Sequence, residues 1–110
     1  MRLTTHVLDT SIGKPASKVS ILLERRGETT WEKLAYGVTD DDGRMSELPA
    51  GIIQGKGSYR LTFETGAYFL SKEEISFYPQ VIIEFYISED SHYHVPLLIS
   101  PYGYSTYRGS

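Results

Sequence analysis

The 110-residue sequence predicts an all-β protein, an antiparallel sandwich of about eight short strands. Segments in which apolar and polar residues alternate recur along the chain, and this period of two gives a strand one apolar face. Clusters of glycine, proline and aspartate separate these segments at intervals of about 8–12 residues, as they do in sandwiches. The chain also contains nine tyrosines and four phenylalanines, which fit a pleated surface.

The strands are predicted from this alternation. The pattern is clear at residues 19–25, where Val19, Ile21 and Leu23 occupy one face. Residues 45–47 form a segment too short to assign. The expected strands cover residues 3–9, 19–25, 31–39, 57–64, 81–87, 92–100 and 103–107.

Turns and one helix are expected between the strands. Residues 10–15, the Asp-Asp-Asp-Gly run at 40–43 and the hairpin residues 101–103 are rich in turn-forming side chains. Over residues 65–77 the pattern changes to a helical period, which predicts one short helix. Ser71 and Glu74 have the spacing of a capping box within this segment.

Length and composition limit the classes of protein. A chain of this length forms a single domain over residues 1–110. The net charge of -3 and the scattered basic residues argue against nucleic acid or an acidic membrane surface as a partner. No apolar run approaches the roughly 20 residues of a membrane span. The chain contains no cysteine, so it is not a disulfide scaffold.

Three histidines are the first candidates for chemistry. His6 lies in the first strand, whereas His92 and His94 share one face of a later strand. Imidazole, with an unperturbed pKa of about 6.5, serves as a base or an acid near neutral pH. Two alternatives to an acid–base role are open. The three rings could be solvated surface side chains, or a His-x-His pair plus a third histidine could bind a catalytic zinc ion.

Arg44 and the end of the chain are further candidates. Arg44 directly follows the aspartate turn, where it could either pair with an aspartate or clamp an anion or carbonyl group. Asp40, Asp41 and Asp42 lack the alternate spacing of a calcium loop, so they indicate a turn. The last residues keep an ordered composition, and a terminal carboxylate on Ser110 could take part in a site.

These motifs together resemble the transthyretin-like family over the whole chain. Within this family, hydrolases and hormone carriers differ at a few positions. His6, Arg44, His94 and the terminal Tyr-Arg-Gly-Ser at 107–110 match the hydrolase branch, and transthyretin lacks them. The segments that carry the resemblance are residues 3–9 with 13–16, 39–44, 65–69 and 92–110.

The resemblance implies a sandwich of two antiparallel four-stranded sheets with one short helix. It also implies a homotetramer, a dimer of dimers whose active sites lie in a channel between the dimers. The expected activity is hydrolysis of 5-hydroxyisourate in urate catabolism, without metal or cofactor. The N1–C6 amide of the purine ring is broken, and the product is 2-oxo-4-hydroxy-4-carboxy-5-ureidoimidazoline. The family occurs in cytoplasm, periplasm and peroxisomes; the short segment before Leu3 favours the cytoplasm.

The resemblance also implies roles for individual residues. His6 and His94 activate and orient the attacking water, and which of them is the base stays open. Arg44 binds the purine carbonyls and stabilises the oxyanion. Tyr107 contacts the substrate, Ser110 orients a histidine or the water, and His92 is structural. The alternative functions are a transthyretin-like carrier without catalysis, a zinc hydrolase and a non-catalytic adhesion sandwich.

Overall fold

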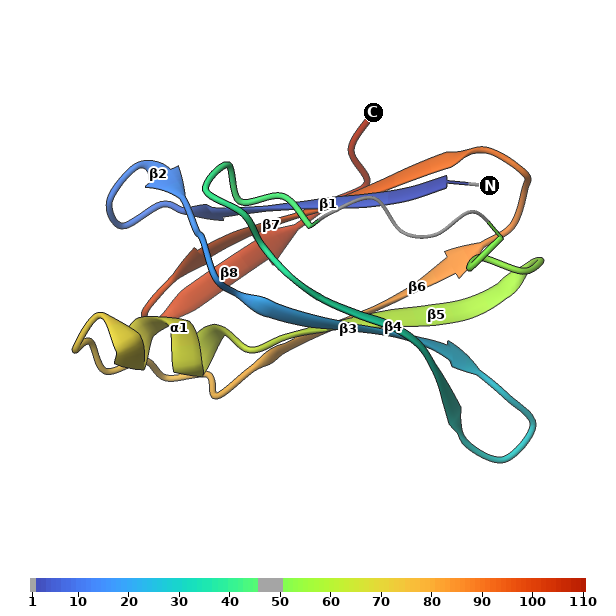
Figure 1. Ribbon diagram of the computed structural model, residues 1–110, viewed down its shortest axis with the longest axis horizontal. Coiled ribbons are helices and arrows are strands. Elements are labelled where there is room, and N and C mark those ends of the chain that lie inside the picture. The colour runs from blue at the N-terminus through green and yellow to red at the C-terminus, as the bar shows by residue number, and fades with distance from the viewer. Residues whose placement is uncertain (1, 46–50) are drawn as a thin grey trace.

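The computed structural model describes residues 2–45 and 51–110, which form two four-stranded sheets and one helix (Figure 1). The predicted sandwich is confirmed, and all seven expected strands are present with small shifts at their ends. An additional strand of two residues lies in the segment expected to be only a turn. Met45 makes an isolated bridge with Thr39, and the rest of segment 45–47 lies outside the described residues. The elements are β1 (Arg2–Asp9), β2 (Lys14–Pro15), β3 (Ser20–Arg26), β4 (Trp31–Val38), β5 (Gly57–Phe63), α1 (Thr65–Ser71), β6 (Val81–Ile87), β7 (His92–Ser100) and β8 (Gly103–Thr106).

The two sheets have the strand orders β2-β1-β7-β8 and β4-β3-β5-β6. Neighbouring strands are antiparallel except β1 and β7, which are parallel. A parallel pair requires a long crossover connection, and here the entire second sheet lies between the two strands in the sequence. In this pair Thr4 is the register partner of His94, and His6 is the partner of Pro96.

The core lies between the sheets and follows the predicted alternation. Along β1 the buried residues are separated by half-buried ones, and β7 behaves similarly, with Pro96 as an additional buried residue. Val7, Leu61 and Leu97 are fully buried. Burying one such aliphatic side chain stabilises the fold by roughly 1.5–3 kcal/mol. The same alternation turns the side chains of Thr4, His6, His92 and His94 to the outer surface of the first sheet, which we call the histidine face.

The helix α1 closes one end of the sandwich (Figure 1). Its buried Tyr68 donates a hydrogen bond to a carboxylate oxygen of Asp9 at 2.8 Å, which ties the helix to β1. The predicted capping box was wrong. Ser71 is the last helical residue and not an N-cap, and its hydroxyl donates to the carbonyl of Tyr68. The chain leaves the helix at Glu73, whose φ is 60°. Among residues 2–45 and 51–110, no helix is long and apolar enough to cross a membrane.

Candidate active site

The candidate site lies on the histidine face, where β1 and β7 run side by side. His6 and His94 are half-buried, whereas His92 is exposed. The parallel register brings the three rings together from positions that are about ninety residues apart in the chain. Two further segments extend the sheet beside them. The Asp40–Arg44 turn bridges His6, and the last residues of the chain bridge His94 at Gly109.

The Asp40–Arg44 turn is built by its first aspartate. One carboxylate oxygen of Asp40 accepts the backbone N–H groups of Asp42 at 2.9 Å and Arg44 at 3.0 Å. The carbonyl of Gly43 accepts the backbone N–H of Val7 at 2.8 Å, which docks the turn on β1. This confirms the interpretation of the aspartate run as a turn, and it fixes the backbone of Arg44 next to His6.

Gly43 is the residue that allows this close approach. Its φ is +77°, in the left-handed region that favours glycine, and an added Cβ would lie 2.3 Å from the carbonyl oxygen of Val7. The same Cβ would lie 3.3 Å from Cδ2 of His6. Any other residue would therefore push the turn away from β1 and from the His6 ring.

The proton on His6 is located by its partner. His6 Nε2 lies 2.8 Å from the carbonyl oxygen of Asp42. Because a carbonyl only accepts, Nε2 must carry the proton that makes this hydrogen bond. The neutral ring then keeps the lone pair of Nδ1, which is the nitrogen that can accept a proton or a hydrogen bond.

His94 is held on two sides. Its Nδ1 lies 2.8 Å from the hydroxyl oxygen of Thr4, and its carbonyl accepts the backbone N–H of Gly109 at 2.8 Å. A Cβ on Gly109 would lie only 2.5 Å from Cδ2 of His94. The backbone of Gly109 therefore packs directly against one edge of the ring, while Thr4 bonds the other edge.

The surroundings of His94 lower its pKa below the usual value. Burial is the main cause, since a charged imidazolium is poorly solvated there. The positive charge of Arg44 lowers the pKa further, as do His92 and His6, while a backbone hydrogen bond with Thr4 acts in the opposite direction. A lowered pKa keeps this imidazole neutral near pH 7, which is the form that a general base requires.

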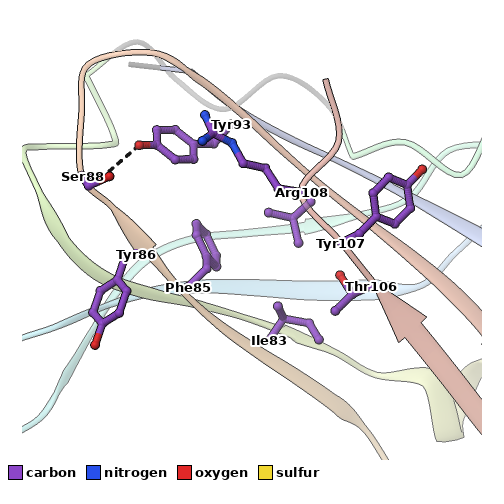
Figure 2. A pocket seen from close by; sticks show the side chains of 9 residues that line it. Ile83, Phe85, Tyr86, Ser88, Tyr93, Thr106, Tyr107 and Arg108 are labelled. Atoms are coloured by element: carbon purple, nitrogen blue, oxygen red, sulfur yellow. Dashed lines mark hydrogen bonds between the residues drawn. The ribbon is translucent and has the colours of Figure 1, made fainter.

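Tyr107 lies apart from these residues within one chain. It lines a hollow between β6 and β8, together with Phe85, Tyr86 and Tyr93 (Figure 2). The guanidinium of Arg108 stacks 4.3 Å from the centre of the Tyr93 ring in the same hollow. Ser110 is exposed and directly follows Gly109. The structure thus brings together His6, Arg44, His94 and the backbone before Ser110. Tyr107 lines a hollow to which none of these three side chains contributes.

One polar residue of the histidine face, Thr4, was not among the candidates predicted from the sequence. The hydroxyl of Thr4 bonds both His94 Nδ1 and His92 Nε2, at 2.8 and 2.9 Å. The period of two along β1 already put Thr4 on the face of His6, which was the available signal. In the part of the chain that the structure describes, no group of three histidine, aspartate or glutamate side chains gathers as a metal site would require.

The fold and this site define a class of protein: a two-sheet sandwich that carries an imidazole and guanidinium site on an open sheet face. The chain belongs to the HIUase/Transthyretin family, whose sequence profile matches residues 3–109.

Individual relatives agree with this assignment. A 5-hydroxyisourate hydrolase of Salmonella typhimurium is 49% identical over 109 residues, which cover 98% of this chain and 80% of the relative. The structure of Klebsiella pneumoniae 5-hydroxyisourate hydrolase has 43% identity and a TM-score of 0.89, with 100% of both chains covered. The structure of transthyretin from Sparus aurata has 28% identity and a TM-score of 0.92, and covers 98% of this chain and 96% of its own.

Proposed function

We propose that this chain hydrolyses 5-hydroxyisourate. Water adds to C6, the N1–C6 amide breaks, and 2-oxo-4-hydroxy-4-carboxy-5-ureidoimidazoline is formed. The observation that carries the proposal is the convergence of His6, His94 and Arg44 on one sheet face. Relatives at 49% identity that bear the name 5-hydroxyisourate hydrolase support the same activity.

The carrier alternative has less support. Transthyretin shares the fold at 28% identity, well below the identity of the hydrolases. A carrier also has no need for two histidines whose nitrogens are oriented by hydrogen bonds. The acid–base arrangement of the histidine face therefore favours catalysis.

Amide hydrolysis needs a base, an oxyanion partner and a proton for the leaving nitrogen. In our proposal, an imidazole on the histidine face takes a proton from water as the oxygen bonds to C6. The tetrahedral intermediate carries its negative charge on the former carbonyl oxygen. Its collapse breaks the bond to N1, which receives a proton from the imidazolium, so the histidine returns to its neutral form.

Both histidines have a nitrogen suited to this exchange. His6 donates through Nε2 to Asp42 and keeps Nδ1 for the water or substrate. His94 bonds Thr4 through Nδ1 and directs Nε2 away from it. The lowered pKa of His94 favours it as the base. His6 then orients the water or supplies the proton for N1.

Arg44 is proposed to bind the purine carbonyls and the oxyanion. It is exposed on the turn that bridges His6, and its positive charge acts on His94. A guanidinium offers a planar fork of donors that matches two neighbouring oxygens. We propose that Ser110, next to Gly109, orients the water or a histidine at the other side of the site.

The proposed homotetramer would complete the site. The histidine face is the outer surface of one sheet, so a second copy is needed to exclude water from it. Tyr107 lies in a separate hollow of its own chain. In our proposal its contact with substrate is made in a site shared between chains of the assembly.

A spectrophotometric assay tests the proposed function. Uricase converts urate to 5-hydroxyisourate, and the decay of that intermediate is followed with and without the protein. The protein should accelerate the decay, His94→Ala should not, and exhaustive chelation should leave the rate unchanged. A folded wild-type protein that leaves the spontaneous decay unaltered would refute the proposal, and activity restored by zinc after chelation would refute its metal-free form.

A further inference from the structure

We propose that Thr4 is a positioning residue whose single hydroxyl links His92 to His94 and fixes which nitrogen of His94 carries the proton. The inference extends the proposed function, because it assigns the base nitrogen and gives His92 a part in the reaction. It starts from two contacts of one oxygen. Thr4 Oγ1 lies 2.8 Å from His94 Nδ1 and 2.9 Å from His92 Nε2.

The strand register produces this arrangement. Thr4 pairs directly with His94 across the parallel strands, and His92 lies two residues earlier on the same face of β7. The two imidazole rings flank the hydroxyl with their centres 6.3 Å apart. A β-branched side chain such as Thr4 has restricted rotation about χ1, so its hydroxyl stays between them.

A hydroxyl has one proton to donate and lone pairs to accept. When it donates to one ring and accepts from the other, both contacts are complete hydrogen bonds. If Thr4 donates to His92 Nε2, it accepts from Nδ1–H of His94, and His94 Nε2 is then unprotonated. If the direction is reversed, His94 Nε2 carries the proton and cannot act as a base. The direction of one hydroxyl therefore decides whether His94 is a base.

The first direction is the one that can stabilise the positive charge formed on His94 during catalysis. The groups that act on its ring are Arg44, His92 and His6, and none of them is an anion that could stabilise the imidazolium. When Nε2 takes a proton from water, Nδ1–H still donates to Thr4. Thr4 in turn donates to Nε2 of His92, so the chain of two hydrogen bonds stabilises the new charge.

The bond to Thr4 keeps the His94 ring in this orientation. A half-turn of the imidazole would exchange Nδ1 with Cδ2, the atom against which Gly109 packs. The half-turn would therefore replace the bond to Thr4 with a carbon atom. Thr4 on one edge and Gly109 on the other leave Nε2 as the nitrogen free for substrate or water.

Thr4→Val and Thr4→Ser form the matched pair of variants for the test. Valine keeps the shape of the side chain without the hydroxyl, whereas serine keeps the hydroxyl. Thr4→Val should lower kcat about tenfold with little change in KM, which is less than the loss of a proton-transfer group itself. Thr4→Ser should keep most of the wild-type kcat. His92→Ala should lower kcat by a similar factor. The double variant Thr4→Val with His92→Ala should be no slower than Thr4→Val alone, because both changes break the same chain.

Nitrogen NMR of ¹⁵N-histidine-labelled protein gives a readout independent of turnover. In the wild type, His94 should be protonated at Nδ1, and in Thr4→Val it should shift toward the Nε2–H form. If the wild type fails to hydrolyse 5-hydroxyisourate, the proposed function falls while the tautomer shift still tests the link through Thr4. An unchanged His94 tautomer in Thr4→Val, or additive losses in the double variant, would overturn the inference.

Discussion

Gly109 packs edge-on against the His94 ring, so close that a Cβ at position 109 would lie 2.5 Å from Cδ2 of the histidine. No side chain fits there, since real Cβ atoms do not come that near a heavy atom. The contact makes the end of the chain part of the candidate site. It also places a specific requirement on a segment that would ordinarily tolerate change.

Gly109→Ala should therefore displace either the His94 ring or the last residues. We expect kcat to fall on the order of tenfold to a hundredfold, because a misplaced base loses its alignment with the substrate. Gly103→Ala is the matched control, since its Cβ would meet only Ser100 Oγ at 3.6 Å. Steady-state kinetics with circular dichroism on both variants make the measurement. Equal activity in the two would contradict the packing argument.

Alanine at His6, Arg44 or His94 should each lower the rate by about 10²–10⁴, the range for a general base or an oxyanion donor. His92→Ala should cost much less, because its ring acts only through Thr4. The same uricase-coupled assay compares all four variants. If His92→Ala lost as much activity as His94→Ala, our division of roles between them would be wrong.

The pH dependence follows from the lowered pKa of His94. A base works only when unprotonated, so kcat/KM should be full above this pKa and should fall as the pH drops through it. Because the pKa is lowered, the fall should occur below the pH at which a free imidazole is protonated. Arg44→Ala removes a positive charge from the surroundings and should move the fall to higher pH. If kcat/KM fell at the same pH in the wild type and in Arg44→Ala, Arg44 would have no effect on the pKa of the base.

Tyr68→Phe tests the link between α1 and β1. The buried carboxylate of Asp9 would lose the hydrogen bond that the Tyr68 hydroxyl donates. We expect the free energy of unfolding, measured in urea, to fall by about 1–3 kcal/mol, the usual cost of an unsatisfied buried group. Activity per folded molecule should not change. Tyr36→Phe is the control, because its bond to Ser20 is exposed and should matter little. Equal free energies of unfolding for the two variants would show that the hydrogen bond from Tyr68 to Asp9 does not stabilise the fold.

Assembly can be tested with the same preparations. We expect multi-angle light scattering to give a mass near four chains and dilution into monomers to abolish turnover, since in our proposal a second copy covers the histidine face. A fully active monomer would show that one chain suffices and that Tyr107 has no part in a shared site.

Local patterns predicted most of the fold. The alternation of Val19, Ile21 and Leu23 with their neighbours indicated a strand because a period of two is a property of the chain itself. The aspartate turn was recognisable for the same reason. The parallel pairing of β1 with β7 was not, because it depends on which strands meet after the whole chain has folded.

The same difference between local patterns and long-range pairing applies to the candidate site. His6, Arg44 and His94 were named from their chemistry and from the family resemblance. The shared hydroxyl of Thr4 and the contact of Gly109 with His94 depend on register between distant segments, which no local pattern encodes. The capping box at Ser71 failed because the helix ends at this residue and does not begin there, and the chain leaves the helix at Glu73 with φ of 60°.

The pairing of β1 with β7 has a consequence for biosynthesis. The bond from Thr4 to His94 spans ninety positions, and Gly109 reaches the ring only after residues 5–108 have been added. A nascent chain emerging from the ribosome can begin its second sheet, but it cannot assemble the histidine face until residues 92–109 have emerged. Long-range pairing of this kind is among the slow steps of folding. Enzymatic turnover should therefore appear only after β1, β7 and Gly109 have come together, later than the pairing of strands within the second sheet.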